Sequence, residues 1–140
     1  MRDYQASRVY RWERNHLPSG PDVRIEHAQA LVDHIWENEG LKYPPRVEPI
    51  AANTTKYAGK ANRFNIWLQP VVSTKTIIHE VAHSMTSDIY GNSAWHSSLF
   101  VGMYCRLLEK YMQVDRFHML ATLGMEGVDI DITASPIFLD

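Results

Sequence analysis

The feature that most constrains the fold is a run of apolar and histidine side chains at helical spacing over residues 73–86. Ser73 or Thr74 can cap the N-terminus of this predicted helix. One arc of the helix is apolar and carries Ile77, Ile78, Val81, Ala82 and Met85. The opposite arc carries His79 and His83. Because an apolar arc has to pack against a core, we expect a folded domain with these histidines beside its core.

The other segments predict a small α+β domain. Helices are expected at 22–39, from residue 92 or 93 to 112, and more weakly at 114–123; strands are expected at 46–50, 54–59 and 63–68. The strands are expected to form a small antiparallel sheet before the helix at 73–86. Residues 1–20 are interpreted as an N-terminal helix or arm, and 128–140 as a C-terminal tail in which 128–132 alternates like an edge strand.

Length and composition favour one globular domain over residues 1–140. The chain is 45% apolar and 21% charged, and its first residues lack the apolar core of a signal peptide. Its single cysteine, Cys105, excludes an internal disulfide framework and a cysteine-based zinc cluster. With a net charge of -2 and no basic stripe, the sequence indicates neither a nucleic-acid partner nor a membrane. We therefore expect a cytoplasmic protein.

The run from His79 to His83 has the pattern His-Glu-x-x-His. A four-residue step on a helix places the two imidazoles on one face, one turn apart, where both can bind one Zn²⁺. Glu80 points about a quarter-turn away, so it is placed to take a proton from a water at the metal rather than to ligate it. The pattern predicts a zinc site with Glu80 as the catalytic base.

Catalytic zinc normally has three protein ligands, so a third ligand is expected downstream. An extended metzincin pattern would need a histidine at Ile89, and Asp88 follows the helix too closely. We prefer His96, which a helix–loop–helix hairpin can return to the metal. Glu109 is the alternative. The remaining histidines, His16, His27, His34 and His118, are interpreted as surface or core residues.

The same motifs resemble a known family core. The segments are Ile66-Trp67-Leu68, Thr76-Ile77-Ile78-His79-Glu80-Val81-Ala82-His83 and Trp95-His96-x-x-x-Phe100. Together they resemble the core of SprT-like zinc metallopeptidases, in which a strand precedes the His-Glu-x-x-His helix and a later histidine completes the site. Ser97 stands where that pattern prefers Gly. The resemblance implies a zincin-like minimal metallopeptidase fold.

A second resemblance lies at the N-terminus. The opening Arg2-Asp3-x-Gln5-x-x-x-Val9-Tyr10-x-x-Glu13 is similar to a family of small metallohydrolases found in bacterial and phage genomes. This opening pattern does not by itself imply any chemistry.

Together these observations predict a zinc-dependent peptidase that carries one Zn²⁺ per chain and acts on peptides or proteins. Tyr90, Tyr104 and His118 are candidates for stabilising the oxyanion. The strand at 63–68 is a candidate edge for pairing with an extended substrate. The alternative is a non-catalytic binding or regulatory module whose zinc is structural, although structural zinc usually has four closed ligands that include cysteines.

Overall fold

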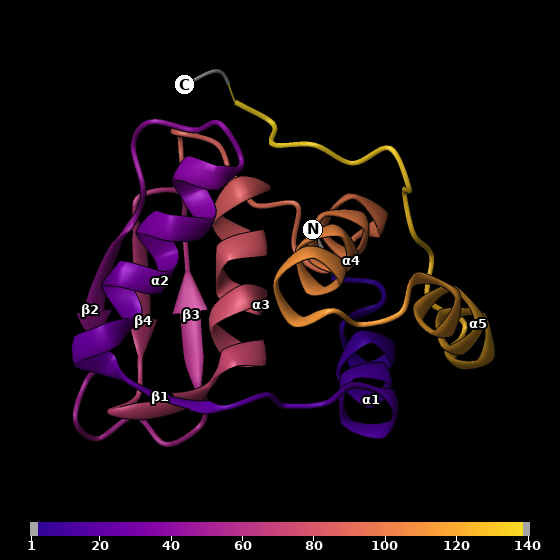
Figure 1. Ribbon diagram of the computed structural model, residues 1–140, viewed down its shortest axis with the longest axis horizontal. Helices are drawn as coiled ribbons and strands as arrows, with labels where there is room; N and C mark the ends of the chain where they lie inside the picture. The colour runs from indigo at the N-terminus through magenta and orange to yellow at the C-terminus, as the bar shows by residue number, and fades with distance from the viewer. Residues whose placement is uncertain (1–2, 139–140) are drawn as a thin grey trace.

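The computed structural model describes residues 3–138, so the first two residues of the predicted arm and the last two of the tail lie outside it. Helices and short strands are mixed, which confirms the α+β class (Figure 1). The helices are α1 (Ala6–His16), α2 (Ile25–Asn38), α3 (Thr74–Met85), α4 (Ser98–Met112) and α5 (Arg116–Glu126). The strands are β1 (Asp22–Arg24), β2 (Arg46–Pro49), β3 (Gly59–Ala61), β4 (Asn65–Leu68) and β5 (Val71–Ser73).

The strands form two small sheets. The larger sheet has the order β2-β4-β3, with β2 parallel to β4 and β3 antiparallel to it, and β1 pairs with β5 in an antiparallel ribbon. The expectation of an all-antiparallel sheet is therefore wrong. Residues 50–58 carry the chain from β2 to the far edge of the sheet, so β3 and not β2 forms the antiparallel turn with β4. The strand expected at 63–68 begins only at Asn65, because the Asn62 side chain accepts hydrogen bonds from the backbone N–H groups of Phe64 and Asn65 and shapes a turn there.

Helix α3 lies at the centre of the fold, with the sheet and α2 on one side and α1, α4 and α5 on the other (Figure 1). It packs against β3 and β4 on one side and against α4 on the other. Its five predicted apolar side chains, Ile77, Ile78, Val81, Ala82 and Met85, are fully buried. Ser73 accepts a hydrogen bond from the N–H of Thr76, so the predicted cap is confirmed. The apolar arc thus fixes which face of α3 is left for the histidines.

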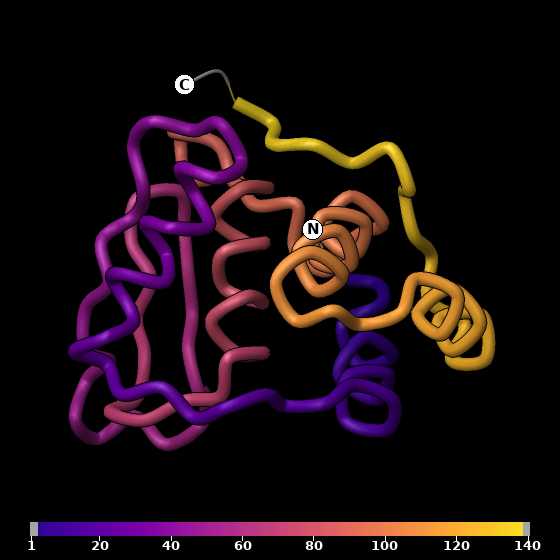
Figure 2. Tube along the Cα trace, in the orientation of Figure 1, coloured from indigo at the N-terminus to yellow at the C-terminus, as the bar shows by residue number. Residues whose placement is uncertain are grey.

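Four predicted segments need correction. The strand expected at 54–59 is observed as β3, Gly59–Ala61, because the Gln69 side chain donates to the carbonyls of Thr54 and Tyr57 and holds the preceding residues in a loop. Helix α2 begins at Ile25 because residues 22–24 pair with β5 as β1. Helix α4 begins after Ser97, not at residue 92 or 93, because the Asp88 carboxylate accepts from the N–H groups of Tyr90 and Asn92 and holds a separate turn. The tail forms no strand within residues 128–138. It runs back across the molecule to α3, where the N–H of Ile137 donates to the carbonyl of Met85 (Figure 2).

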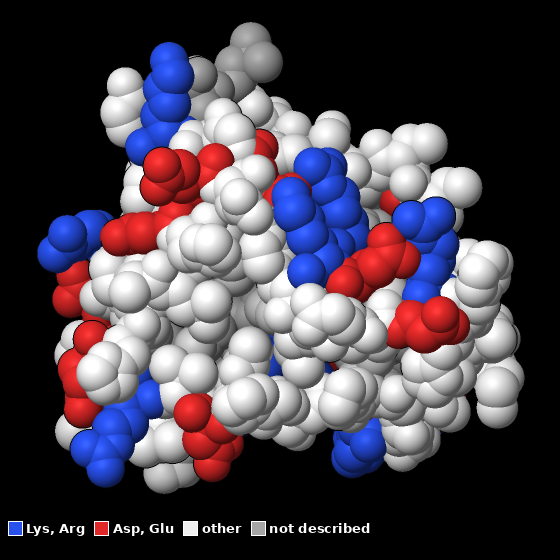
Figure 3. All heavy atoms as spheres, viewed as in Figure 1, with Lys and Arg blue, Asp and Glu red and all other residues white. Residues whose placement is uncertain are grey.

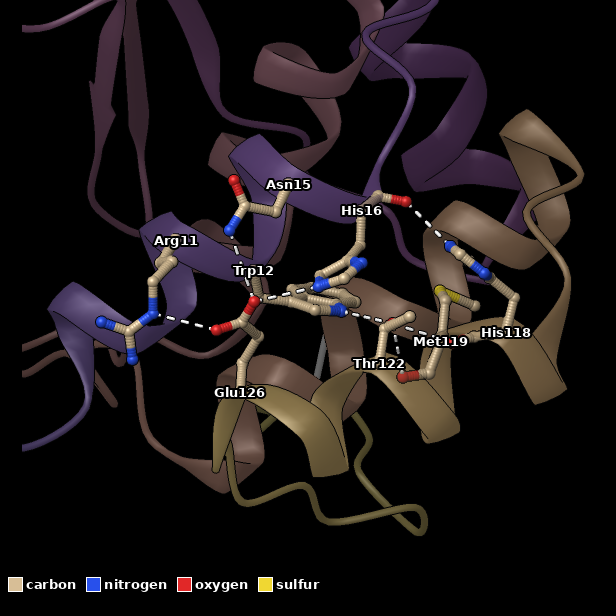
Figure 4. A network of polar contacts seen from close by, with 8 residues as sticks. All are labelled: Arg11, Trp12, Asn15, His16, His118, Met119, Thr122 and Glu126. Carbon is tan, nitrogen blue, oxygen red and sulfur yellow. Dashed lines mark hydrogen bonds and ion pairs between the residues drawn. The ribbon is translucent and has the colours of Figure 1, made fainter.

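Helix α1 is attached to α5 by a polar network (Figure 4). The buried Trp12 indole donates to the Thr122 hydroxyl at 2.8 Å. The Glu126 carboxylate accepts from Arg11 and pairs with His16, each at 2.9 Å. These contacts fix the position of α1, whose other face reaches α3 and α4.

On the face shown in Figure 3, acidic and basic side chains are interspersed. Within the described part of the chain, no helix combines the length and the apolar character needed to cross a membrane.

Candidate metal centre

Three histidines converge between α3 and α4; His79 and His96 are buried and His83 is partly buried. His79 and His83 come from adjacent turns of α3, and His96 comes from the loop just before α4. One nitrogen from each ring lies within 4.8 Å of the other two. The ring of Phe100 stacks on His83 with centroids 4.2 Å apart and restricts its orientation. Two consecutive turns of one helix and the start of the next therefore supply three ligand atoms to one point.

The spacing of the nitrogens fits a tetrahedral metal. The Nε2 atom of His83 lies 3.1 Å from Nε2 of His79 and 3.2 Å from Nε2 of His96. Ligands at about 2.0–2.1 Å from a tetrahedral zinc stand roughly 3.3–3.4 Å apart, which is close to these distances. A proton shared between nitrogens can satisfy only one of these two contacts. A metal ion at the centre satisfies all three nitrogens.

A buried carboxylate from α1 holds His79. Glu13 Oε2 lies 2.9 Å from Nδ1 of His79, and the same oxygen accepts a 2.6 Å hydrogen bond from the Tyr104 hydroxyl. When Nδ1–H of His79 donates to Glu13, its Nε2 carries the lone pair that a metal needs. Glu13 thereby selects the ligating tautomer of His79.

A second carboxylate does the same for His96. Asp3 Oδ2 lies 2.6 Å from Nδ1 of His96, and Asp3 Oδ1 accepts from the backbone N–H of His96 at 3.3 Å. Trp95, the preceding residue, has a left-handed backbone with φ 57, and Ser97 has an ordinary φ of -70. The turn that presents His96 therefore does not need Gly at position 97.

The three imidazoles have different proton affinities. Burial lowers the pKa of His79, but the charge and hydrogen bond of Glu13 outweigh it and leave that pKa above its ordinary value. Burial raises the pKa of Glu13, but the charge and hydrogen bond of His79 outweigh it, so that pKa lies below its ordinary value. Burial, together with the charges of His79 and His96, holds the pKa of His83 well below its usual range. His83 is thus kept neutral, as metal ligation requires.

Glu80 lies beside the histidines and faces a cleft. The cleft has a volume of about 770 Å³ and is lined by Tyr10, Glu13, Arg14, Leu17, Ser19, Lys56, Tyr57, Ala58, Gly59, Lys75, Thr76, His79 and Glu80. Glu80 is only 6% exposed, and burial raises its pKa to about 7, with an opposing effect of His79 and a further rise from Glu13. None of the residues in the range 3–138 makes a hydrogen bond or ion pair with this carboxylate.

Gly59 brings the sheet edge up to this carboxyl group. A β-carbon built on Gly59 would lie 3.2 Å from Cγ of Glu80 and 3.0 Å from the carbonyl oxygen of Trp67. A side chain at position 59 would require β3 or the Glu80 side chain to move by a few tenths of an ångström, so glycine suits this close approach of β3 to α3. As a result, Glu80 is held between the edge of the sheet and the histidines.

The structure brings together all the residues chosen for the site from the sequence. His79, His83 and His96 form the cluster, with Glu80 next to His79. The alternative ligand Glu109 lies elsewhere, in a bidentate ion pair with Arg116 at 2.9 Å. Among the described residues, these three histidines form the one group of side chains close enough to hold a metal. The other four histidines lie outside the cluster.

Sequence reasoning missed Asp3, Tyr10 and Glu13 as site residues. Yet all three belong to the N-terminal pattern, whose residue Arg2 lies outside the described residues. A fourth member, Gln5, is buried and exchanges two hydrogen bonds with the backbone of Asp129. The sequence feature that could have pointed to these residues is the spacing of polar side chains in a segment with few apolar positions. Their role becomes visible only when α1 is packed against the rest of the fold.

No protein family model, curated protein or solved structure matches this chain. The site is therefore interpreted from its own geometry.

Proposed function

We propose that this protein is a zinc-dependent hydrolase, a zincin-like metallopeptidase of the SprT-like type. One observation carries the proposal: the Nε2 atoms of three histidines converge beside a buried glutamate that lines an open cleft. Three histidine ligands with one open position are typical of catalytic zinc. Such histidines usually donate the N–H of their non-ligating ring nitrogen to a carboxylate, as His79 and His96 can here.

In this proposal Glu80 moves the protons. The bound metal supplies a Lewis acid that polarises the attacking water and the scissile carbonyl. Glu80 accepts a proton from that water and later donates it to the leaving amine. A general base works best with a pKa near the working pH, and burial raises the pKa of Glu80 to about 7.

Tyr10 is the proposed donor to the oxyanion, in place of the three candidates chosen from the sequence. The Tyr104 hydroxyl donates to Glu13, His118 bonds the carbonyl of His16, and Tyr90 is 83% exposed. The Tyr10 ring lies 4.9 Å from that of His96 and lines the cleft with Glu80. Burial and then the charge of Glu80 raise its pKa to about 12, so the hydroxyl keeps its proton. A protonated hydroxyl at this position can stabilise developing negative charge.

Strand β3 is the proposed docking edge for an extended substrate. The strand at 63–68 was expected to have this role, but its observed part, β4, lies in the middle of the sheet. Ala58 accepts from the N–H of Gln69, which fixes the register so that the backbone N–H and C=O groups of Gly59 and Ala61 point away from β4. An extended peptide can pair with these groups and pass alongside Glu80.

A structural zinc module remains the alternative function. It is disfavoured by the cleft, because a structural site is closed by four ligands and does not need a carboxylate facing its metal. The experiment below separates the two functions.

The test is Glu80→Gln. The variant keeps shape and hydrogen-bonding reach but cannot accept the proton, so we expect unchanged zinc content and a loss of roughly 10²–10⁴ in rate. Wild type and variant are incubated with a diverse peptide mixture, and zinc-dependent cleavages are mapped by mass spectrometry. Glu126→Gln, which changes a glutamate in the α1–α5 network, is the matched control. Equal cleavage by Glu80→Gln and wild type would exclude the mechanism, and no cleavage by wild type would favour the structural module.

A further inference from the structure

The cleft beside Glu80 carries three cationic side chains from three separate parts of the chain. Arg14 comes from α1, Lys56 from the segment before β3, and Lys75 from the first turn of α3. The chain as a whole has a net charge of -2, so a group of three cations around one cleft departs from the overall charge balance. Their convergence there needs a physical explanation.

These cations form no ion pair with a carboxylate among residues 3–138, although the charge of Lys75 acts on Glu13. None of them takes part in an ion pair, whereas Arg11, Lys110 and Arg116 all do. The Nζ atom of Lys56 lies 5.5 Å from the centroid of the Tyr57 ring. Their charges are therefore available to a ligand.

One of the two carboxylates of the cleft, Glu13, is already engaged by other groups. Glu13 pairs with His79 and accepts from Tyr104 through the same oxygen. Glu80 faces the metal side of the cleft. Glu80 is only 6% exposed, so a negatively charged ligand in the outer cleft meets the cations without competition from Glu13 and with little from Glu80.

We propose that this cleft selects peptides with acidic side chains next to the bond that is cut. The proposal rests on the proposed peptidase function and specifies its substrate class. A peptide paired with β3 projects alternate side chains on the two sides of its strand. Side chains on the cleft side reach Arg14, Lys56 and Lys75, where Asp or Glu gains charge–charge interactions that Asn, Gln, Lys or Arg do not.

Binding to the zinc-loaded Glu80→Gln protein tests this selectivity without relying on catalysis. Three labelled peptides of equal length, rich in Asp and Glu, in Asn and Gln, or in Lys and Arg, are titrated by fluorescence anisotropy. Exposed ion pairs contribute modestly, so we expect roughly two- to fivefold tighter binding of the acidic peptide for each cation that it meets. The preference should weaken at high salt, because exposed charges are screened.

Variants of the cations give the control. Arg14→Gln, Lys56→Gln and Lys75→Gln are added together to the Glu80→Gln protein. In this variant the affinities for the acidic and the neutral peptide should become about equal, with zinc content unchanged. Arg46→Gln, an exposed arginine on β2, should leave the ratio unchanged. Equal affinities for the three peptides, no binding of any peptide, or a ratio unaffected by the triple substitution would overturn the proposal. If the acidic peptide binds as expected but wild type cleaves nothing, the peptidase function fails and the ligand class stands.

Discussion

Helix α1 has a cluster of histidine and carboxylate side chains on each of two faces. On one face, Glu13 reaches into the core and holds His79. On the other, Arg11 and His16 meet Glu126 of α5 (Figure 4). The residue types are similar. In the first cluster, one ring nitrogen of His79 and of His96 contacts a carboxylate, and the other ring nitrogen faces the nitrogen of another histidine. In the second cluster, each ring nitrogen that makes a contact faces an oxygen atom.

The comparison shows what makes a histidine cluster a metal site. In both clusters a carboxylate contacts one ring nitrogen of a histidine and orients the ring. Only around His79 do ring nitrogens of several histidines, not engaged by a carboxylate, meet at one point. The outer cluster attaches α1 to α5, and so helps to hold Glu13 where the inner cluster needs it. One helix therefore serves both the fold and the site, and substitutions on its two faces should separate the two roles.

The largest effect is expected for His79→Ala. Apparent binding energies of about 10–16 kcal/mol for four-ligand zinc sites imply roughly 10²–10³-fold in affinity per ligand, so this variant should lose its zinc on purification and all zinc-dependent cleavage. His16→Ala, in the outer cluster, should keep about one zinc per chain. Metal analysis of both proteins, purified without added zinc, checks this. Full zinc occupancy in His79→Ala would contradict the whole assignment of the site.

Tyr10→Phe tests the catalytic side of the inner face. Loss of one oxyanion donor typically lowers kcat by about 10²–10³-fold, while the metal and the substrate are still bound. We therefore expect a lower kcat with KM and zinc content close to wild type. Tyr90→Phe changes an exposed tyrosine and is the matched control. If Tyr10→Phe raises KM without lowering kcat, Tyr10 contributes to substrate binding and not to the oxyanion.

Glu13→Gln removes the charge behind His79 and keeps an oxygen that can accept from Tyr104. Substitution of a supporting carboxylate commonly weakens metal binding by about 10–100-fold. We expect that loss in zinc affinity, measured by competition with a chromophoric chelator. Tyr104→Phe removes only the hydrogen bond to Glu13 and should have a smaller effect. Equal zinc affinity in Glu13→Gln and wild type would show that the orientation of His79 does not depend on this charge.

The sequence was most informative where contacts are local. The apolar arc, the cap and the His79–His83 step all lie within one helix, so helical spacing alone predicted α3 and its two ligands. His96 was chosen over Glu109 because a short hairpin can return it, and in the structure it lies with the other two histidines.

The supporting residues were beyond such reasoning because their contacts are distant along the chain. Glu13 is separated from His79 by 66 residues, and Asp3 from His96 by 93. No periodicity connects segments so far apart. The expectation of an antiparallel sheet failed for a similar reason: the parallel pairing of β2 with β4 depends on the path of residues 50–58, which has no regular pattern. A polar residue that is buried on docking, such as Glu13, looks like a surface residue in the sequence.

The smallest effect is expected for Glu126→Gln, on the outer face. Hydrogen bonds from Arg11 and then His16 lower the pKa of Glu126, so its carboxylate favours the folded state when ionised. This contribution is fully present above the ordinary glutamate pKa of about 4.3 and is lost as the pH falls through the lowered folded-state pKa. Wild type should therefore melt slightly above Glu126→Gln at neutral pH, and the two curves should converge in acid.

Thermal melts of both proteins across a pH series measure this difference. Salt should reduce it, because the pairs around Glu126 are partly exposed and screened. Zinc affinity should be equal in the two proteins at neutral pH, because Glu126 does not touch the histidines of the metal centre. A clear loss of zinc in Glu126→Gln would mean that the outer cluster positions Glu13 directly, and that the two faces of α1 act as one unit.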